Sequence, residues 1–367
     1  GRSLVAKAEI KLDEVVLEES PLVSAQFSWN KAYGYLACEH CMAPLESAED
    51  NIRRLAKQPI ILPYPEMDAA RDVLQRVTQC LDCQVKFCSV ECLDQANKVY
   101  HKIMCASSRP FNQINEIWKK MHYPPESASV LLVLRIFAMI KNNPKYLADL
   151  NEFCQNSVNE DLSIAHKILG EKFTSQLSHL HQAFVQVFSN DEILSNFLTI
   201  EGLTQIFALI GTNAQGIGSS SFAIWVKNVS ELETIDDKQR TEVDDLIDTF
   251  YATLEETVGQ FLNNEGSGLY SKQSKINHSC SPNAEVRFPF SNFVLQVVAT
   301  RNIKPDEEIC ISYLDECQLD RSRHSRQKFL QENYVFLCEC QKCNDEIEQP
   351  DVTSDEDNEE MDTDEDD

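Results

Sequence analysis

Closely spaced cysteines constrain the fold of this chain more than any other feature of its sequence. Between residues 38 and 105, seven cysteines and one histidine form four pairs: Cys38-x2-Cys41, Cys80-x2-Cys83, Cys88-x3-Cys92 and His101-x3-Cys105. Zinc prefers four sulfur or nitrogen ligands in a tetrahedron, and a Cys-x2-Cys turn supplies two thiolates at once. Eight such ligands complete two closed sites, which are structural because no position is left for water. The spacing predicts metal binding in a reducing compartment rather than disulfides or scattered core thiols.

Three more cysteines lie close together near the end of the chain: Cys338, Cys340 and Cys343. They are one ligand short of a tetrahedron, and Cys280 in "INHSC" is the predicted fourth ligand. A zinc ion there would fasten the late segment across the turn that carries Asn277 and His278. The sequence therefore predicts three zinc ions in all. The remaining cysteines are interpreted as core or free thiols: Cys154, Cys310 and Cys317.

The charge of the chain limits its partners. The net charge is −26, and 14 acidic residues without a Lys or Arg lie between Asn344 and Asp367. This acidic segment has few apolar residues and is predicted to be disordered. A negative net charge argues against nonspecific binding to nucleic acid and suits a basic protein partner. Taken alone, this charge is explained equally well by a role in keeping the protein soluble. No apolar run approaches the roughly 18 residues of a membrane span, so we expect no membrane segment.

The order of predicted elements favours an α+β fold. Short β-branched runs broken at Pro21 predict strands within residues 1–30, and strand-like sequence returns after Asn277. The region between them is helical, and "ESASVLLVLRIFAMIKNN" is apolar almost all round, which predicts a buried helix. In the segment 240–262, apolar residues recur on one face of a second helix. A sheet formed by the two ends of the sequence, with a helical insert, is an α+β arrangement.

Three motifs carry a family resemblance: "INHSC", "DEEICISYLD" and "ENYVFLCECQKC". They resemble the SET domain of protein-lysine methyltransferases, and the paired ligands of residues 38–105 resemble a MYND zinc finger. SET strands interrupted by a MYND finger are typical of the SET and MYND domain (SMYD) family. The acidic end, with no TPR-like domain after the cysteine triplet, is most similar to the fifth member of that family.

The resemblance implies a division of the chain. The expected segments are an N-terminal SET part (1–37), a MYND-type finger with a long insertion (38–105), a helical SET insert (106–275), the C-terminal SET core (276–315), a post-SET zinc segment (316–343) and a disordered acidic tail (344–367). In MYND fingers the ligand pairs interleave. One zinc would then be held by Cys38, Cys41, Cys88 and Cys92, and the other by Cys80, Cys83, His101 and Cys105. His40 is expected to be an exposed spacer rather than a ligand.

The resemblance also implies the residues of an active site. Tyr313 matches the catalytic tyrosine, Tyr334 and Phe222 match aromatic residues of the lysine channel, and Phe336 matches a residue that packs on adenine. The other residues that match cofactor contacts, besides Tyr313 itself, are Arg2, Ser219, Ser220, Asn277 and His278. Taken singly, an aromatic residue at a strand end is usually core, and an Asn-His pair before a turn is usually local capping. The order of the motifs around Cys280 and the triplet favours the functional interpretation.

These residues suit lysine methylation. The reaction displaces the sulfonium methyl of S-adenosylmethionine by a neutral amine, and it depends on orientation and the exclusion of water. An apolar channel disfavours the ammonium form of lysine, whose reference pKa is about 10.4. We therefore expect an S-adenosylmethionine-dependent protein-lysine methyltransferase with three structural zinc ions. The alternative is a catalytically silent adaptor in which the finger binds partners.

The resemblance further implies the setting in which the protein works. The implied substrates are histone tails or other basic proteins, including ribosomal proteins, and implied partners of the finger are repressor complexes. A monomer in the nucleus and cytoplasm is expected, without direct contact to nucleic acid.

Overall fold

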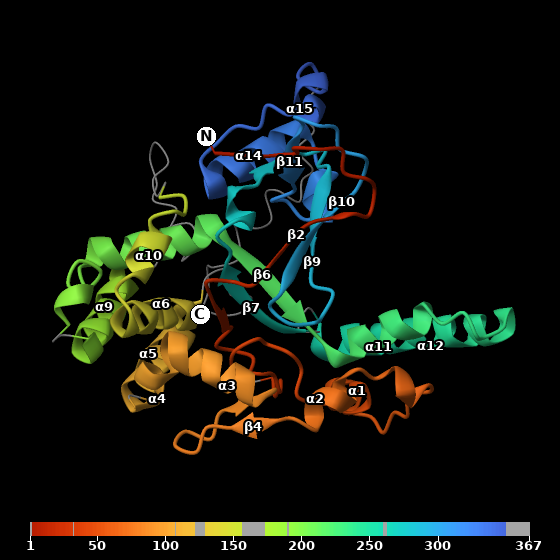
Figure 1. The fold of residues 1–367 in the computed structure, drawn as a ribbon, viewed down its shortest axis with the longest axis horizontal. Helices are drawn as coiled ribbons and strands as arrows, with labels where there is room; N and C mark the ends of the chain where they lie inside the picture. Colours follow the sequence, from red (N-terminus) through yellow and green to blue (C-terminus); the bar gives the residue numbers. More distant parts are fainter. Residues whose placement is uncertain are drawn as a thin grey trace, which may run out of the picture.

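The computed structural model describes residues 2–31, 33–106, 108–121, 129–155, 173–188, 191–259 and 263–349. Strands from both ends of the chain and helices from its middle form an α+β fold, as predicted (Figure 1). Beyond Gln349, the tail that was predicted to be disordered lies outside the described residues. Its first two residues, Asn344 and Asp345, belong to α15 (Gln341–Asp345). Among the described residues, no helix is long and apolar enough to span a membrane.

Three small sheets each join one strand from the first 26 residues to strands from after residue 213. The first has the order β1 (Leu4–Val5), β11 (Glu308–Ile311), β8 (Asn277–His278). The second has the order β2 (Val15–Glu19), β10 (Leu295–Ala299), β9 (Ala284–Arg287). The third has the order β3 (Val23–Gln26), β7 (Asn264–Leu269), β6 (Ala214–Ser219). Because β8 and β11 pair in parallel with His278 opposite Ile311, His278 comes to lie beside the start of the segment that carries Tyr313.

The helical insert packs around one buried helix. In α6 (Val130–Asn142) ten residues are buried, including Arg135, so the prediction of a helix that is apolar almost all round is confirmed. The helices of this layer are α5 (Ser108–Met121), α7 (Tyr146–Leu150), α9 (Phe173–Phe188), η3 (Glu192–Leu194) and α10 (Ile200–Asn213). Thr199 caps the start of α10 by accepting a hydrogen bond from the backbone N–H of Gly202 at 2.9 Å. Val23, Ala25 and Leu269 join the same core, which fixes the insert against the third sheet.

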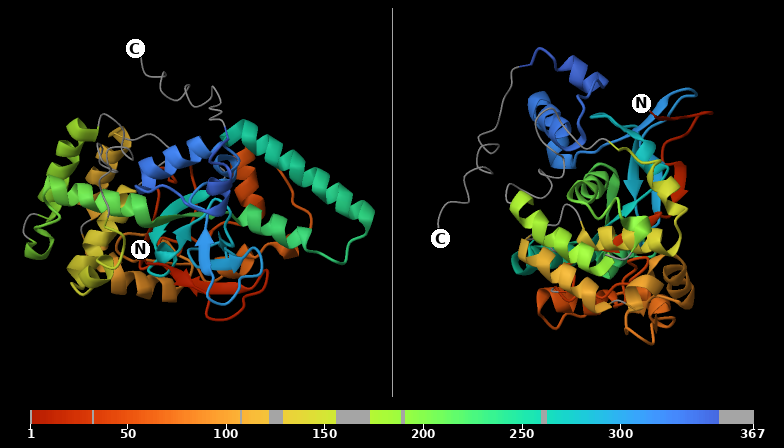
Figure 2. Two further views of the ribbon diagram at one scale, coloured as in Figure 1. Left: turned by 90° about the horizontal axis from the view of Figure 1, so that it is seen from above. Right: turned by 90° about the vertical axis from the view of Figure 1, so that its left-hand side faces the viewer.

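A helical lobe forms a second core at the end of β6 that lies away from α10 (Figure 1). The elements of this lobe are α1 (Ala48–Ala56), η1 (Pro65–Met67), α11 (Ser221–Ser230) and α12 (Asp237–Val258), whereas Val73 of α2 (Ala70–Leu74) packs against the core of the finger. The predicted apolar face of α12 is buried at Val243, Ile247, Phe250 and Leu254, where it packs against α1 and α11. Figures 1 and 2 show α11 and α12 extending away from the sheets. The part of the insertion that runs to Met67 therefore folds with this lobe, and its last part packs on the finger.

The finger and the C-terminal segment lie on different sides of the molecule (Figure 1). The elements of the finger are β4 (Thr78–Gln79), β5 (Lys86–Phe87), α3 (Val90–Ala96), a π-helical turn η2 (Asn97–His101) and α4 (Lys102–Ala106). The remaining elements are η4 (Gln273–Lys275), α13 (Glu316–Leu319) and α14 (Arg323–Tyr334), followed by α15. The C-terminal helices lie over the first sheet and close one side of the pocket described below.

Candidate active site and zinc clusters

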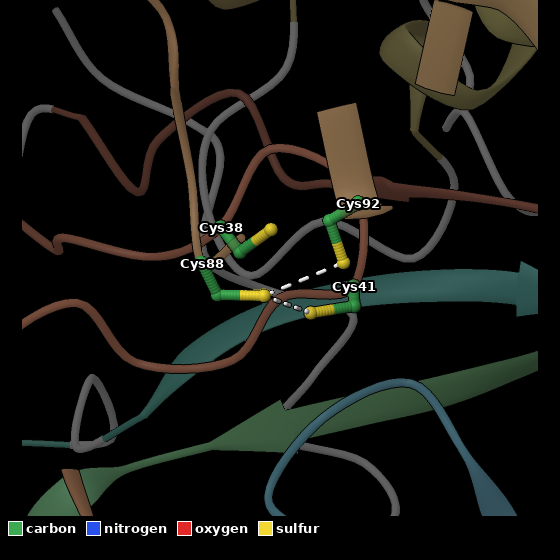
Figure 3. A group of neighbouring side chains, drawn as sticks. All are labelled: Cys38, Cys41, Cys88 and Cys92. Carbon is green, nitrogen blue, oxygen red and sulfur yellow. Dashed lines mark hydrogen bonds between the residues drawn. The ribbon is translucent and has the colours of Figure 1, made fainter. Parts of the chain in front are cut away.

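The finger contains two groups of four metal-binding side chains. In each group the ligand atoms lie within 4.8 Å of one another. The groups are Cys38, Cys41, Cys88 and Cys92, drawn in Figure 3, and Cys80, Cys83, His101 and Cys105. This is the interleaved grouping that the MYND resemblance implies. The sulfur of Cys88 lies 3.5 Å from that of Cys41 and 3.3 Å from that of Cys92, close to the separation of about 3.8 Å expected for thiolates around one zinc ion.

His40 is not in either group, but it is not exposed as expected. Its ring makes an edge contact with Phe293 at 5.2 Å and lies 6.0 Å from Tyr100. Burial and the nearby Arg135 lower its pKa to about 4. His40 is therefore a neutral packing residue between the finger and the SET strands.

The third group consists of Cys280, Cys338, Cys340 and Cys343, and its sulfur atoms also lie within 4.8 Å of one another. Cys280 comes from the turn after β8, whereas the other three flank the start of α15. The sulfur of Cys280 lies 3.6 Å from that of Cys343 and 4.0 Å from that of Cys338. Four thiolates at this spacing suit a structural zinc ion, which would join segments about sixty residues apart in the sequence.

A pocket of about 920 Å³ lies between the third group, β8 and the end of the first sheet. Six of the residues implied for the active site line it: Arg2, Asn277, His278, Tyr313, Tyr334 and Phe336. The ring of Tyr313 lies 4.8 Å from that of Tyr334, and it meets Phe336 edge-on at 6.2 Å. Three aromatic rings therefore converge on one side of the pocket, where they can exclude water from a bound group.

Tyr313 is held by hydrogen bonds at both ends. Its hydroxyl donates to the carbonyl oxygen of Ile276 at 2.6 Å, and its backbone N–H donates to Nδ1 of His278 at 2.9 Å. Burial raises the pKa of Tyr313 above its ordinary value, so the phenol is neutral. The hydroxyl is therefore suited to orient a reacting group rather than to take up its proton.

His278 connects Tyr313 to the third cysteine group. Because Nδ1 accepts a hydrogen bond, the ring proton belongs on Nε2, which lies 3.3 Å from the sulfur of Cys280. Burial lowers the pKa of His278 to about 4, which keeps the ring in this neutral form. One imidazole thus touches both a predicted zinc ligand and the backbone of the predicted catalytic residue.

Comparison with known proteins identifies the fold. A family model described as the SET domain matches residues 1–314, most of the chain. The chain belongs to the SET-domain family. The protein-lysine N-trimethyltransferase SMYD5 of Gallus gallus is 46% identical to it over 369 residues, which cover 98% of this chain and 87% of that protein. The protein of the same name from Homo sapiens is 45% identical over 366 residues, which cover 97% of this chain and 87% of that protein.

The resemblance to the SMYD family is confirmed by these matches, which extend over nearly the whole chain. A shorter match joins this chain to the histone-lysine N-methyltransferase ASHR1 of Arabidopsis thaliana, which is 44% identical over 79 residues, 22% of this chain and 15% of that protein.

Three charged residues meet at one end of the SET pocket. Arg2 donates through Nη1 to the backbone oxygen of Glu152 at 3.1 Å and lies 3.4 Å from its carboxylate. Nζ of Lys275 lies 3.1 Å from the same carboxylate. The hydrogen bond and charge of Lys275, together with Arg2, lower the pKa of Glu152. This end of the pocket therefore offers two cations and one anion, which together suit a zwitterionic group.

Three of the implied site residues do not line this pocket. Phe222 stacks on Trp225 at 5.8 Å inside the helical lobe, and it meets Phe250 edge-on. Ser219 donates to the backbone oxygen of Met42 at 2.7 Å, and Ser220 caps α11. The physical reason is packing: "SSSFAIW" starts a helix capped by Ser220, and its aromatic residues are buried against α1 and α12 in the lobe.

Other residues of the pocket were not found from the sequence. They are Glu152, Phe153 and Thr212, together with the thiols Cys154 and Cys310. The segment 152–154 is held there by Asn213, whose side chain accepts from the N–H of Cys154 and donates to its oxygen, both at 2.9 Å. Asn213 is the last residue of α10, and no local pattern in the sequence connects it to this segment.

Proposed function

We propose that this chain is a protein-lysine N-methyltransferase. The observation that carries the proposal is the pocket itself, in which a neutral tyrosine and two further aromatic rings lie beside charged groups within a SET fold. Two SMYD5 relatives are named as protein-lysine N-trimethyltransferases. From these names we infer that the reaction can proceed to trimethyllysine.

The residues of the pocket fit S-adenosylmethionine, which would supply a methyl group on a sulfonium. Arg2, Lys275 and Glu152 suit its charged amino acid end, and Phe336 suits its adenine by stacking. Tyr313 and Tyr334 would line the channel for the lysine side chain. Their apolar rings disfavour the ammonium form of lysine, and the hydroxyl of Tyr313 would orient the free amine.

Three zinc ions would stabilise this arrangement without taking part in the chemistry. Two four-thiolate groups and one group of three cysteines and a histidine match the ligand sets of closed structural sites. In each group the four ligands would complete a tetrahedron around zinc and leave no open position for a substrate.

We further propose that the substrates are Lys-rich proteins such as histone tails or ribosomal proteins. The net charge of −26 supports attraction of a basic partner. By family resemblance we also propose partners in repressor complexes for the finger, a monomeric state, and a place in both nucleus and cytoplasm. A catalytically silent adaptor is not favoured, because the pocket keeps the tyrosine and the charged groups that methyl transfer needs.

Replacement of Tyr313 by phenylalanine tests the proposed chemistry. The variant keeps the ring but loses the hydroxyl, so kcat should fall by about two orders of magnitude or more, the scale of one lost transition-state hydrogen bond. The Kd for S-adenosylmethionine, measured by calorimetry, should change little. Tyr270→Phe is the matched control, because the hydroxyl of Tyr270 also donates to a backbone oxygen, that of Phe293, but lies outside the pocket. A wild-type chain that binds no S-adenosylmethionine would favour the adaptor.

A further inference from the structure

Arg326 in α14 is a buried charge beside the third cysteine group. Among the described arginines and lysines, only Arg326 and Arg135 are buried, and each is 2% exposed. Nη2 of Arg326 lies 3.7 Å from the sulfur of Cys343 and donates to the carboxylate of Glu346 at 2.6 Å. Nη1 donates to the backbone oxygen of Arg321 at 2.5 Å. One guanidinium therefore joins the start of α14, a predicted zinc ligand and the residue after α15.

Neighbouring residues of α14 reinforce this connection. The side-chain amide of Gln327 donates to the backbone oxygen of Cys338 at 2.6 Å and accepts from its N–H at 2.8 Å. Nε of Arg323 donates to the backbone oxygen of Cys343 at 2.9 Å. These three hydrogen bonds position the backbone of the ligand residues, whereas Arg326 reaches a sulfur.

A four-thiolate zinc site carries a net charge of −2, and burying it without donors is costly. Donors in the second shell around a metal hold its ligands in place and raise its affinity. The planar guanidinium suits this task because it can donate to several partners at once from a fixed fork, which a lysine cannot do.

The second buried arginine provides a contrast within the same molecule. Arg135 lies near the first group, but its described hydrogen bonds run to oxygen atoms: the backbone of Ser24, and the backbone and carboxylate of Glu39. It joins the finger to β3 and donates to no thiolate in these bonds. Contact with the ligand sulfur therefore distinguishes Arg326.

We propose that Arg326 is a positioning residue that retains the third zinc ion and, through it, the C-terminal wall of the cofactor pocket. Tyr334 ends α14 and Phe336 lies between α14 and Cys338, so the position of both rings depends on α14 and on the segment that the metal would hold. The inference rests on the zinc binding proposed above. Measurement of the zinc content of the wild-type chain, which should be three ions, tests that premise separately.

Zinc release to a chromogenic chelator is the direct measurement. In Arg326→Met, one of three zinc equivalents should be released at least about tenfold faster than in the wild type, the lower end of the effects seen when a residue that holds a metal ligand in place is lost. The Kd for S-adenosylmethionine, measured by calorimetry, should rise in the same variant and return toward the wild-type value when zinc is added in excess. This faster release should be absent from Cys280→Ser, with or without the Arg326 substitution, because that chain has already lost the third zinc ion.

Two variants separate the thiolate contact from general packing. Arg323→Gln removes a hydrogen bond to the backbone of Cys343, and Glu346→Gln removes the ion pair of Arg326 while keeping the guanidinium. Both should release zinc within about threefold of the wild-type rate, because neither substitution removes the contact between the guanidinium of Arg326 and the sulfur of Cys343. Release of all three equivalents at the wild-type rate in Arg326→Met, or equal acceleration of all three, would overturn the proposal. If Arg326→Met does not fold, Arg326→Lys decides, and an unchanged rate in that variant would also overturn it.

Discussion

The finger groups and the third cysteine group use the same ligand chemistry but stand in different relations to the rest of the molecule. All eight ligands of the finger fall between residues 38 and 105, and the ligands of the third group come from segments on either side of residue 300. A site with local ligands stabilises mainly its own module. A site that joins distant segments determines where those segments lie.

Contacts around the groups reflect this difference. The finger is attached to the SET strands by Arg135, whose guanidinium stacks on Tyr100 at 4.3 Å and pairs with Glu39. The third group touches His278 directly, and His278 binds the backbone of Tyr313. Cys338 and Cys340 also line the pocket. We infer that the third group shapes the active site and that the finger chiefly supports the fold.

Replacement of a single predicted zinc ligand should give the largest difference in effect between the finger and the third cysteine group. In Cys280→Ser we expect one zinc ion to be lost and binding of S-adenosylmethionine to become undetectable by calorimetry, because a structural zinc contributes on the order of 10 kcal/mol to ordering its ligands. In Cys83→Ser we also expect one zinc ion to be lost, but the Kd for the cofactor should stay within about threefold, well under the tenfold change that corresponds to 1.4 kcal/mol. Equal loss of cofactor binding in the two variants would show that the finger and the pocket are one cooperative unit.

The sequence predicted most of the fold because its strongest signals are local or chemically specific. Paired cysteines allow few arrangements, and the predicted grouping of twelve ligands into three sites agrees with the spacing of the sulfur and nitrogen atoms. The apolar run around Arg135 predicted a buried helix, which is confirmed, although nothing in the run showed that Arg135 pairs with Glu39. The α+β order followed from where strand-like segments begin and end.

Predictions were weaker where the site depends on tertiary packing. Phe222 was expected in the lysine channel, yet the insertion after Cys41 supplies α1, against which α11 packs, so that its aromatic residues face the lobe. The part played by Glu152 and Cys154 depends on the end of α10, which no local pattern connects to them. Long-range contacts of this kind carry no periodic signal in one sequence.

Removal of Arg135 should affect stability rather than the pocket. Arg135→Met leaves the carboxylate of Glu39 without its cation in a largely buried setting, and breaking such a pair costs about 3–5 kcal/mol. We expect a loss of about 3 kcal/mol in the free energy of unfolding, measured by urea denaturation with zinc present. The Kd for S-adenosylmethionine should remain close to that of the wild type, because Arg135 does not line the pocket. The double variant Arg135→Met/Glu39→Gln should recover part of the loss, and no recovery would mean that packing on Tyr100 matters more than the charge pair.

The smallest effect should come from two helix ends that share a left-handed backbone. Val335 ends α14 at φ 63° between Tyr334 and Phe336, and Lys57 ends α1 at φ 55° in the helical lobe. Glycine adopts this conformation without the steric penalty, which is about 1–2 kcal/mol for other residues, and it is also more flexible. Lys57→Gly should therefore raise the free energy of unfolding by up to about 1 kcal/mol and leave cofactor binding unchanged.

Val335→Gly should gain less stability, because it also loses a partly buried side chain. It should weaken binding of S-adenosylmethionine roughly fivefold, since the two rings beside it would be less firmly preorganised. Calorimetry at saturating zinc measures both affinities. If the Val335 variant binds the cofactor as tightly as the wild type, side-chain packing alone orients the rings of Tyr334 and Phe336. The left-handed backbone at Val335 would then not contribute to the difference between the two regions.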